Sequence, residues 1–510
     1  MQSPNVLLII LDTLRRDHLS PYGYLRDTAP NLAHFASEAT QFEYAVSPAQ
    51  WTIPAHASLF SGHYASVHGV TEGSHSLRGE HPTLAEILRV GGYRTIGFSN
   101  NPLVGLIDNG FSRGFDHFYN YSGASPNRPV DAKRPAVQRA INRQTRQMVH
   151  HIQQQFARSN WLFRVSMSPM LTPLWTRLIN YKGHTERSLQ DASETIRAHH
   201  GQPLFTFINL MGAHLPYRPP QSALDSVAPH LKHDRRAYEF VRHFNSEGAK
   251  WASPPDPQLT AWQQRALLDF YDAEVRHQDE LLGKFLHGLD SHGILDNTLV
   301  IIMADHGEGH GDHQFLGHGF VVYQELVHVP LLIRFPNREG AGQKVSTPIS
   351  TRRIFHTMLD FAQLTPPLDE ADPNAQVGAL SLRSTLADAV DIEGQTPFAE
   401  AFPPHTFLHV LEHRNPTLID RLRLRQVRRA VYHQGNKLAM VGDQVEGFYH
   451  VQQDPFEHVN LATDAPNQVA HLHGLLTRFT QQQATQRAQA HLPVDDPAIV
   501  DQLRALGYLE

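Results

Sequence analysis

Runs of apolar residues bounded by polar ones recur along the first two thirds of the chain. Three such runs predict strands buried on both faces, as in the centre of a parallel sheet: Asn5–Leu11, Pro203–Leu210 and Leu299–Ala304. Arg94–Ser99 and Pro330–Phe335 predict two further strands. The pattern therefore predicts an α/β fold built around one large, mixed and mostly parallel sheet.

Helical patterns lie between these runs. The segment Thr83–Val90, followed by two glycines, predicts a short helix with a glycine stop. A longer pattern from about Leu259 to Leu289 predicts a second, much longer helix. We expect helices of this kind to flank the sheet.

The character of the chain changes beyond about residue 370. Arg428–His433, Lys437–Val441 and Glu446–Val451 predict short strands joined by tight turns, which is typical of a small antiparallel sheet. We therefore expect two domains. Residues 1–370 would form the large-sheet domain, and residues 371–510 would form a subdomain with the small sheet and a terminal helix.

The composition is that of an ordinary globular protein, with 41% hydrophobic and 18% charged residues among 510. The net charge of −6 excludes binding of nucleic acid through bulk positive charge. No apolar segment reaches the roughly 18 residues needed to cross a membrane, and Val6–Leu11 is too short for a signal peptide. We therefore expect a cytoplasmic protein, and the absence of cysteine agrees with that location.

A basic insert is predicted at about residues 122–200. Within it, residues 126–182 contain ten Lys or Arg and a single acidic residue, Asp131. Aromatic residues and methionines alternate with arginines in its second half, so a helical insert could cover an active-site mouth, attract an anionic substrate or lie on anionic lipid. A plain helical cap on the core is equally open, and Pro169 and Pro173 argue against a long membrane helix.

The segment Trp51–Gly62 combines residues at a distinctive spacing. Thr52 is followed by Pro54 two residues later, by His56 four later and by Gly62 ten later. This spacing resembles the signature of the sulfatase branch of the alkaline-phosphatase superfamily. Members of that branch typically convert a Cys or Ser nucleophile to formylglycine and carry Arg four residues on. Oxidised threonine would be a ketone, so the resemblance implies Thr52 as the nucleophile without formylglycine, with His56 orienting it or an anionic oxygen.

Two carboxylates and an imidazole are expected at one edge of the sheet. Asp12 follows the first predicted strand, and Asp305 and His306 follow the third, at the ends where open α/β sheets bind ligands. In the sulfatase resemblance these residues match metal ligands, and Thr52 completes the set. A nitrogen ligand favours Mn²⁺ or Zn²⁺, with Mg²⁺ and Ca²⁺ left open. We expect one divalent metal ion.

Further segments supply candidate substrate contacts. His214, in a His-x-Pro-Tyr segment, and His318, where sulfatases usually have Lys, match residues that contact the ester. One would protonate the leaving group while the other binds a non-bridging oxygen. Asn101 lies where many sulfatases have a basic residue and is a candidate donor to a substrate oxygen. His310 and His313 match no role, so we expect solvated loop histidines.

These residues predict ester hydrolysis at phosphorus. A Thr52 ester can be cleared by a second displacement at phosphorus, whereas formylglycine releases sulfate through a second hydroxyl that threonine lacks. We therefore expect a metal-dependent hydrolase of phosphate or phosphonate esters, with an anionic ester substrate and no nucleic-acid partner. The alternatives are a sulfatase without formylglycine, a phosphoglycerol-type transferase and a non-catalytic anion-binding protein. Contact of the basic insert with anionic lipid and a homo-oligomer are left open.

Overall fold

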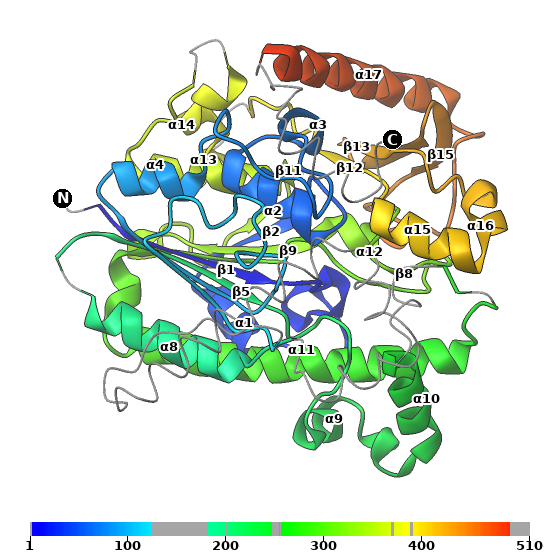
Figure 1. Ribbon diagram of the computed structural model, residues 1–510, viewed down its shortest axis with the longest axis horizontal. Coiled ribbons are helices and arrows are strands. Elements are labelled where there is room, and N and C mark those ends of the chain that lie inside the picture. Colours follow the sequence, from blue (N-terminus) through cyan, green and yellow to red (C-terminus); the bar gives the residue numbers. More distant parts are fainter. Residues whose placement is uncertain are drawn as a thin grey trace.

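The computed structural model describes residues 3–123, 182–199, 201–246, 254–255, 257–368, 372–387 and 391–489. Figure 1 shows a large sheet with helices on both faces and a smaller sheet at one end of it. Both sheets were predicted, and the α/β class with a C-terminal antiparallel subdomain is confirmed.

The large sheet is mixed and mostly parallel. Its strand order is β10-β2-β9-β6-β1-β5-β3-β4, with β11 also paired to β2. Among the described strands of this large sheet, only β9 runs antiparallel to its neighbours, which are β2 and β6. The strands are β1 (Asn5–Leu11), β2 (Thr40–Val46), β3 (Arg94–Ser99), β4 (His117–Asn120), β5 (Leu204–Leu210), β6 (Thr298–Met303), β9 (His328–Arg334), β10 (Lys344–Val345) and β11 (Ile349–Ser350).

The centre of this sheet is the apolar run predicted at the N-terminus. Strand β1 pairs in parallel with β5 on one side and with β6 on the other. Its residues Val6–Leu11 are buried, as are all residues of β5 and β6. The carboxyl ends of β1 and β6 therefore lie side by side, which brings the residues that follow them together.

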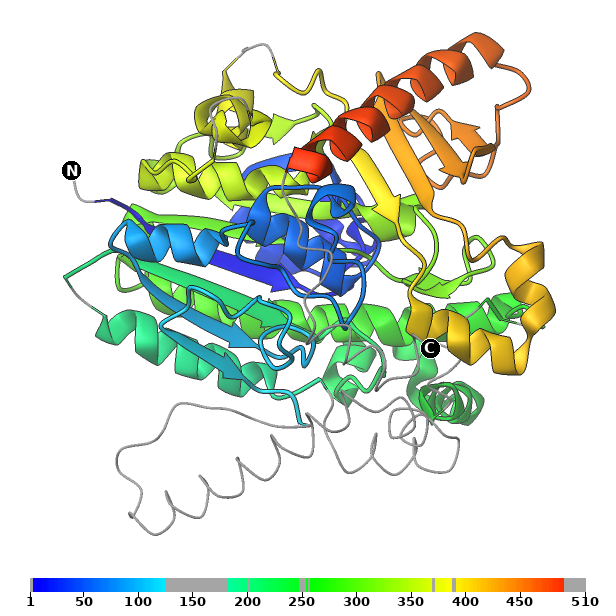
Figure 2. The ribbon, with the colours of Figure 1, turned by 45° about the horizontal axis from the view of Figure 1, so that its top comes forward.

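Helices cover both faces of the large sheet (Figure 2). The long predicted helix is present as α11, and the short one as α4; each begins with a reciprocal capping box, at Thr260 and Thr83 respectively. One face carries α1 (Pro30–Ser37), α8 (Thr185–Ala198) and α11 (Ala261–Asp290), and the other carries α2 (Thr52–Ser61), α4 (Leu84–Val90) and α13 (Ile354–Ala362).

The small sheet has the order β12-β13-β14-β15 and is antiparallel. Buried side chains on one of its faces, including Leu438 and Phe448, pack against the long C-terminal helix α17. A parallel bridge between Ala49 and Glu400 joins the small sheet to the large domain. The strands and helices of this C-terminal part are β12 (Phe398–Ala401), β13 (Arg428–His433), β14 (Asn436–Val441), β15 (Gln444–Tyr449), α15 (His405–Arg414), α16 (Pro416–Arg421) and α17 (Pro466–Gln489).

The remaining elements are short. A two-stranded ribbon follows β6, and small helices fill the connections. They are β7 (Gly309–His310), β8 (Leu316–Gly317), α3 (Ala65–His68), α9 (Gln221–Val227), α10 (Arg235–Ser246), α12 (Gln324–Val327) and α14 (Val377–Leu380).

The predicted domain limits stay predictions. Val377 and Leu382 still pack in the large core, whereas the first strand of the small sheet begins at Phe398. The greater part of the basic insert, residues 124–181, lies outside the described residues, and so does its predicted lipid contact. Its last part is the sheet-covering helix α8, whose Leu189 and Ala192 belong to the core.

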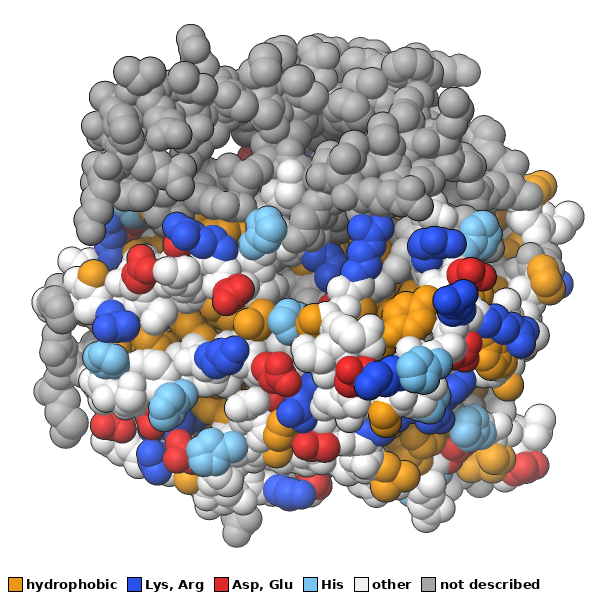
Figure 3. All heavy atoms as spheres, turned by 90° about the horizontal axis from the view of Figure 1, so that it is seen from below, with side chains coloured by type: hydrophobic (Ala, Val, Ile, Leu, Met, Phe, Trp, Pro, Cys, Tyr) orange, Lys and Arg blue, Asp and Glu red, His pale blue; other side chains and the backbone are white. Residues whose placement is uncertain are grey.

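The described helices include none that is long and apolar enough to cross a membrane. Figure 3 shows one face of the molecule, on which acidic, basic and histidine side chains are intermixed. That mixture differs from the continuous basic surface that a nucleic-acid backbone requires. The expected cytoplasmic location, the lack of a nucleic-acid partner and a homo-oligomer remain predictions.

Candidate active site

The predicted metal ligands meet at the carboxyl ends of β1 and β6. Nε2 of His306 lies 3.3 Å from Oδ2 of Asp305 and 3.8 Å from Oδ1 of Asp12. The hydroxyl of Thr52, at the start of α2, lies 3.3 Å from the same nitrogen. The structure thus brings together the four side chains that sequence reasoning placed around one cation, with ligand atoms of Asp12, Asp305 and His306 within 4.8 Å of one another.

The donor set fits a divalent cation. Nδ1 of His306 lies 2.9 Å from the carbonyl oxygen of Gly307 and donates to it, so Nε2 presents a lone pair to the site. Oδ1 of Asp12 and Oδ2 of Asp305 are buried and have no hydrogen-bond partner. Buried carboxylate oxygens are costly unless a proton or a cation balances them. Their convergence with a free imidazole lone pair is what a metal site requires.

The electrostatics of the site agree with this assignment. Burial raises the pKa of Asp305 to about 7. Burial, together with the neighbouring Asp305 carboxylate, raises the pKa of Asp12 well above its ordinary value. Among the described residues, neither carboxylate is paired with a Lys or Arg side chain. Positive charge at this point would therefore be strongly favoured.

Thr52 is the first residue of α2 and is 2% exposed. The first N–H groups of a helix have no acceptor within it, and the helix dipole places partial positive charge there. Because α2 has ten residues and begins at Thr52, its nucleophile candidate lies at the end that attracts anions. At the other end Gly62 has a φ of +75°, and an added Cβ would lie 2.8 Å from the ring of Phe355.

Two more imidazoles face this group. The ring of His318 lies 4.5 Å from that of His306 and 5.3 Å from that of His214, measured between centroids. Nδ1 of His318 donates to Glu308 at 2.8 Å. Burial alone would lower the pKa of His318, but the Glu308 carboxylate raises it above its ordinary value. Glu308 was missed as a functional residue, although it stands in the same Asp-His-Gly-Glu motif as the ligands.

His214 has a different partner. Its Nδ1 lies 2.5 Å from the carbonyl oxygen of Leu215, which is neutral, and burial lowers its pKa to about 4. The pKa values of the two histidines predicted to contact the ester are therefore shifted in opposite directions. The protonated form is favoured at His318, because its partner is a carboxylate.

Asn101 and His56 are each hydrogen-bonded to another residue of the site, and their predicted roles stay predictions. The amide of Asn101 donates to Oδ2 of Asp12 at 2.6 Å, so this side chain fixes a predicted ligand. Nδ1 of His56 lies 2.9 Å from the backbone carbonyl oxygen of Thr52, and its Nε2 accepts from Asn209 at 3.1 Å. The ring of His56 is fully buried and bonded to the backbone of Thr52.

The expectation of solvated loop histidines is wrong for His310 and His313. His310 is 2% exposed; its Nδ1 accepts from Arg15 at 3.2 Å and its Nε2 donates to the Tyr217 hydroxyl at 2.7 Å. His313 is partly buried, stacks on a tyrosine ring and donates to Glu325 at 2.8 Å. The partners of His310 are 295 and 93 residues away in sequence, so no local pattern indicated its bonds.

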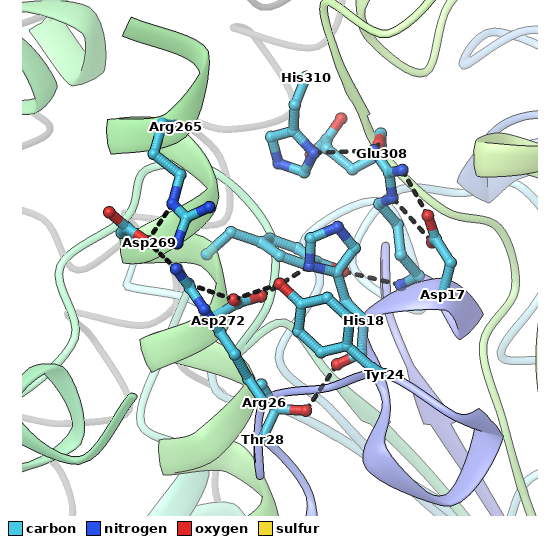
Figure 4. A network of polar contacts seen from close by, with 12 residues as sticks. Asp17, His18, Tyr24, Arg26, Thr28, Arg265, Asp269, Asp272, Glu308 and His310 are labelled. Carbon is cyan, nitrogen blue, oxygen red and sulfur yellow. Dashed lines mark hydrogen bonds and ion pairs between the residues drawn. The ribbon is translucent and has the colours of Figure 1, made fainter. Parts of the chain in front are cut away.

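A buried polar network supports the loop that follows Asp12 (Figure 4). Asp272 on α11 accepts hydrogen bonds from His18 at 2.6 Å, from Tyr24 at 2.7 Å and from Arg26 at 2.6 Å. These bonds attach the segment after β1 to the long helix. The predicted ligand Asp12 is therefore fixed from both sides, by β1 before it and by this network after it.

Lys182, the last residue of the basic stretch 126–182, is a second residue that sequence reasoning missed. Its ammonium donates to the carbonyl oxygens of Gly212 at 2.7 Å and Pro216 at 3.2 Å, on either side of His214, and pairs with Glu274 at 2.8 Å. It therefore fixes the loop that carries His214.

Solved structures share this fold. The chain superposes on the phosphonate monoester hydrolase of Agrobacterium radiobacter with a TM-score of 0.64 and 20% identity, over 96% of each chain. A protein solved with its substrate D-glucosamine-2-N,6-O-disulfate gives a TM-score of 0.65 and 17% identity, over 95% of this chain and 99% of the other. Fold and site together define an ester hydrolase of the alkaline-phosphatase-like superfamily.

Sequence comparison identifies the family within that class. The model described as Sulfatase matches residues 4–364. The N-acetylglucosamine-6-O-sulfatase of Bacteroides thetaiotaomicron is 22% identical over 449 residues, which are 80% of this chain and 75% of the relative. The arylsulfatase of Clostridium perfringens is 24% identical over 392 residues, 71% and 76% of the two chains. The chain belongs to the sulfatase family, as the sequence motifs predicted.

Proposed function

We propose that this sulfatase-family hydrolase cleaves phosphate or phosphonate esters with Thr52 as its nucleophile. The observation that carries the proposal is the meeting of the Thr52 hydroxyl with Asp12, Asp305 and His306, whose orphaned oxygens fit one divalent cation. Mn²⁺ or Zn²⁺ suits a set that includes an imidazole. When bound, the cation supplies positive charge that lowers the pKa of the neighbouring hydroxyl and offsets charge on the ester.

The chain's own residues then divide the work. The Thr52 oxygen forms a bond to phosphorus as the bond to the leaving alcohol breaks, and His318, paired with Glu308, gives that alcohol its proton. His214 orients a non-bridging oxygen. The first N–H groups of α2 stabilise the negative charge there. Water then attacks the same phosphorus as the bond to Thr52 breaks, and one proton of the water passes to the Thr52 oxygen while the acid product leaves. The proton that Thr52 lost to solvent in the first step is replaced on His318 from solvent, which restores the starting state.

The threonine itself favours phosphorus over sulfur. Threonine has one hydroxyl and a methyl group, so the elimination by which a formylglycine hydrate releases sulfate has no counterpart here. The phosphonate monoester hydrolase of similar fold supports the same ranking as an analogy. A sulfatase without formylglycine, a phosphoglycerol-type transferase and a non-catalytic anion-binding protein are the competing functions.

Turnover of four chromogenic esters tests the proposal. Metal-stripped protein would receive Mn²⁺, Zn²⁺, Mg²⁺ or Ca²⁺ and be assayed on a phosphate monoester, a phosphate diester, a phosphonate monoester and a sulfate ester. Thr52→Ala should lose about a thousandfold or more in kcat, while Thr52→Ser, which keeps the hydroxyl, should stay within about tenfold. Fastest turnover of the sulfate would reverse the ranking, and no turnover of any ester would favour the anion-binding alternative.

A further inference from the structure

The hydrogen bonds of His56 determine which of its ring nitrogens carries the proton. Nδ1 faces the backbone carbonyl oxygen of Thr52 at 2.9 Å, and a carbonyl oxygen only accepts, so Nδ1 carries hydrogen. The ring is fully buried among Phe60, Phe111 and Phe207, each with its centroid 6.1 Å away. An apolar enclosure of this kind disfavours a charged ring.

The other nitrogen of the ring then needs a donor. In a neutral ring with Nδ1–H, Nε2 presents a lone pair, and the residue 3.1 Å from it is Asn209. Asn209 is fully buried and is the next-to-last residue of the mostly apolar strand β5. Its amide nitrogen is the matching donor. A side chain of this polarity in the core of a sheet needs such a partner.

We propose that Asn209 is a positioning residue for the ligand Asp305 and that it acts through His56. Asn209 keeps the ring in the Nδ1–H form and in its orientation. That N–H donates to the carbonyl oxygen of Thr52, and its nitrogen lies 3.5 Å from Oδ2 of Asp305, close enough for the N–H dipole to attract the carboxylate without a hydrogen bond. The inference rests on the proposed function only in taking Asp305 as a metal ligand.

His56 therefore links three parts of the site. Three phenylalanine rings surround it, Asn209 on β5 donates to its Nε2, and its Nδ1–H binds the first turn of α2 through the backbone of Thr52. Loss of Asn209 would leave the ring free to turn, and the N–H dipole 3.5 Å from Oδ2 of Asp305 would no longer be fixed.

A double-mutant cycle tests this chain of contacts. Asparagine at position 56 places its own N–H near the position of Nδ1, so His56→Asn keeps the donor without needing Asn209. The dissociation constant of Mn²⁺ would be measured by titration calorimetry for the wild type, Asn209→Leu, His56→Asn and the double variant. We expect Mn²⁺ to bind about tenfold more weakly to Asn209→Leu than to the wild type. Binding should be about threefold weaker in His56→Asn, and equally so in the double variant.

Two outcomes would overturn the inference. In the first, Asn209→Leu binds Mn²⁺ as tightly as the wild type does. In the second, the losses of the two single variants multiply in the double variant, which means that Asn209 acts independently of His56. If Asn209→Leu does not fold, the nitrogen spectrum of ¹⁵N-histidine-labelled wild type, with His56→Asn to identify the signal, decides the matter. A ring protonated on Nε2 contradicts the proposal, and one protonated on Nδ1 supports it.

The readout also separates this inference from the proposed function. Calorimetry requires no turnover, so the predicted cycle can be obtained even if none of the four esters is hydrolysed. In that case the positioning role stands and the hydrolytic function falls. Turnover of an ester with an unchanged Mn²⁺ affinity in Asn209→Leu gives the reverse result.

Discussion

Replacing Asp305 by asparagine should stabilise the metal-free protein while it destroys the metal site. The change preserves shape, and the retained Oδ1 can still accept from the backbone N–H of His306 at 3.0 Å. The new amide replaces an oxygen that has no partner, and it can donate to the His306 lone pair 3.3 Å away. The variant therefore removes a buried negative charge and adds no buried group without a partner.

The magnitude follows from the pKa of Asp305, which burial raises from its ordinary 3.8 to about 7. Because the folded value is the higher one, the carboxyl group favours unfolding once it ionises. Stability is fully present below pH 3.8 and is lost as the pH rises through 7. A gap of about 3 in pKa corresponds to ~4 kcal/mol above pH 7, of which roughly 2–3 kcal/mol is lost between pH 5 and pH 8.

Urea unfolding of chelator-treated protein at pH 5, 6, 7 and 8 measures this effect. The wild type should lose stability with rising pH, and Asp305→Asn should exceed it by about 2–4 kcal/mol at pH 8. Added Mn²⁺ should raise the free energy of unfolding of the wild type but not that of Asp305→Asn. Asp312→Asn is the matched control. Burial would raise the pKa of Asp312, but Arg15 at 2.8 Å lowers it well below its ordinary value. This second variant should lose about 1–3 kcal/mol. A loss of stability in metal-free Asp305→Asn at pH 8 would refute the reasoning.

Three further predictions concern the surroundings of the site. Adding Mn²⁺ at about a hundred times its dissociation constant should raise the free energy of unfolding by ~3 kcal/mol, measured by urea titration with and without the ion. Glu308→Gln should lower the pKa of His318, so kcat should fall about 10–100-fold and the alkaline limb of its pH profile should move to lower pH. Lys182→Met should cost about 3 kcal/mol of stability, because Glu274 is left buried without its counterion; an unchanged urea midpoint would contradict this.

The central strands could be predicted from the sequence because burial on both faces leaves an uninterrupted apolar run. Strands β1, β3 and β13 coincide with the predicted ranges residue for residue. Strand β2 was not predicted. Its sequence, Thr-Gln-Phe-Glu-Tyr-Ala-Val, mixes polar and apolar positions, and it lies towards the edge of the sheet beside the antiparallel β9. Such a strand is specified by its neighbours more than by its own pattern.

The same distinction applies to the site. Asp12, Asp305 and His306 were accessible to sequence reasoning because each directly follows an apolar strand, and parallel strands end at one edge. Asn209 lies inside such a run, and its role depends on a histidine 153 residues away. The available signal was the asparagine within the run Leu-Phe-Thr-Phe-Ile-Asn-Leu. It could indicate that a buried hydrogen bond is made, but not which residue is the partner.

Strand β1 lies at the centre of the large sheet, so it can pair on both sides only after much of the chain has been synthesised. Asn5–Leu11 is made first, yet its two sheet neighbours are Leu204–Leu210 and Thr298–Met303. At roughly 5–20 residues per second, the strand waits on the order of 15–60 s for its second partner to leave the ribosome. An apolar strand that stays unpaired for so long can bind chaperones and can start aggregation. Expression at lower temperature, where chains are initiated more slowly, should therefore raise the soluble yield more than added metal would. Asp305, a predicted metal ligand, is synthesised only after the last central strand of the sheet.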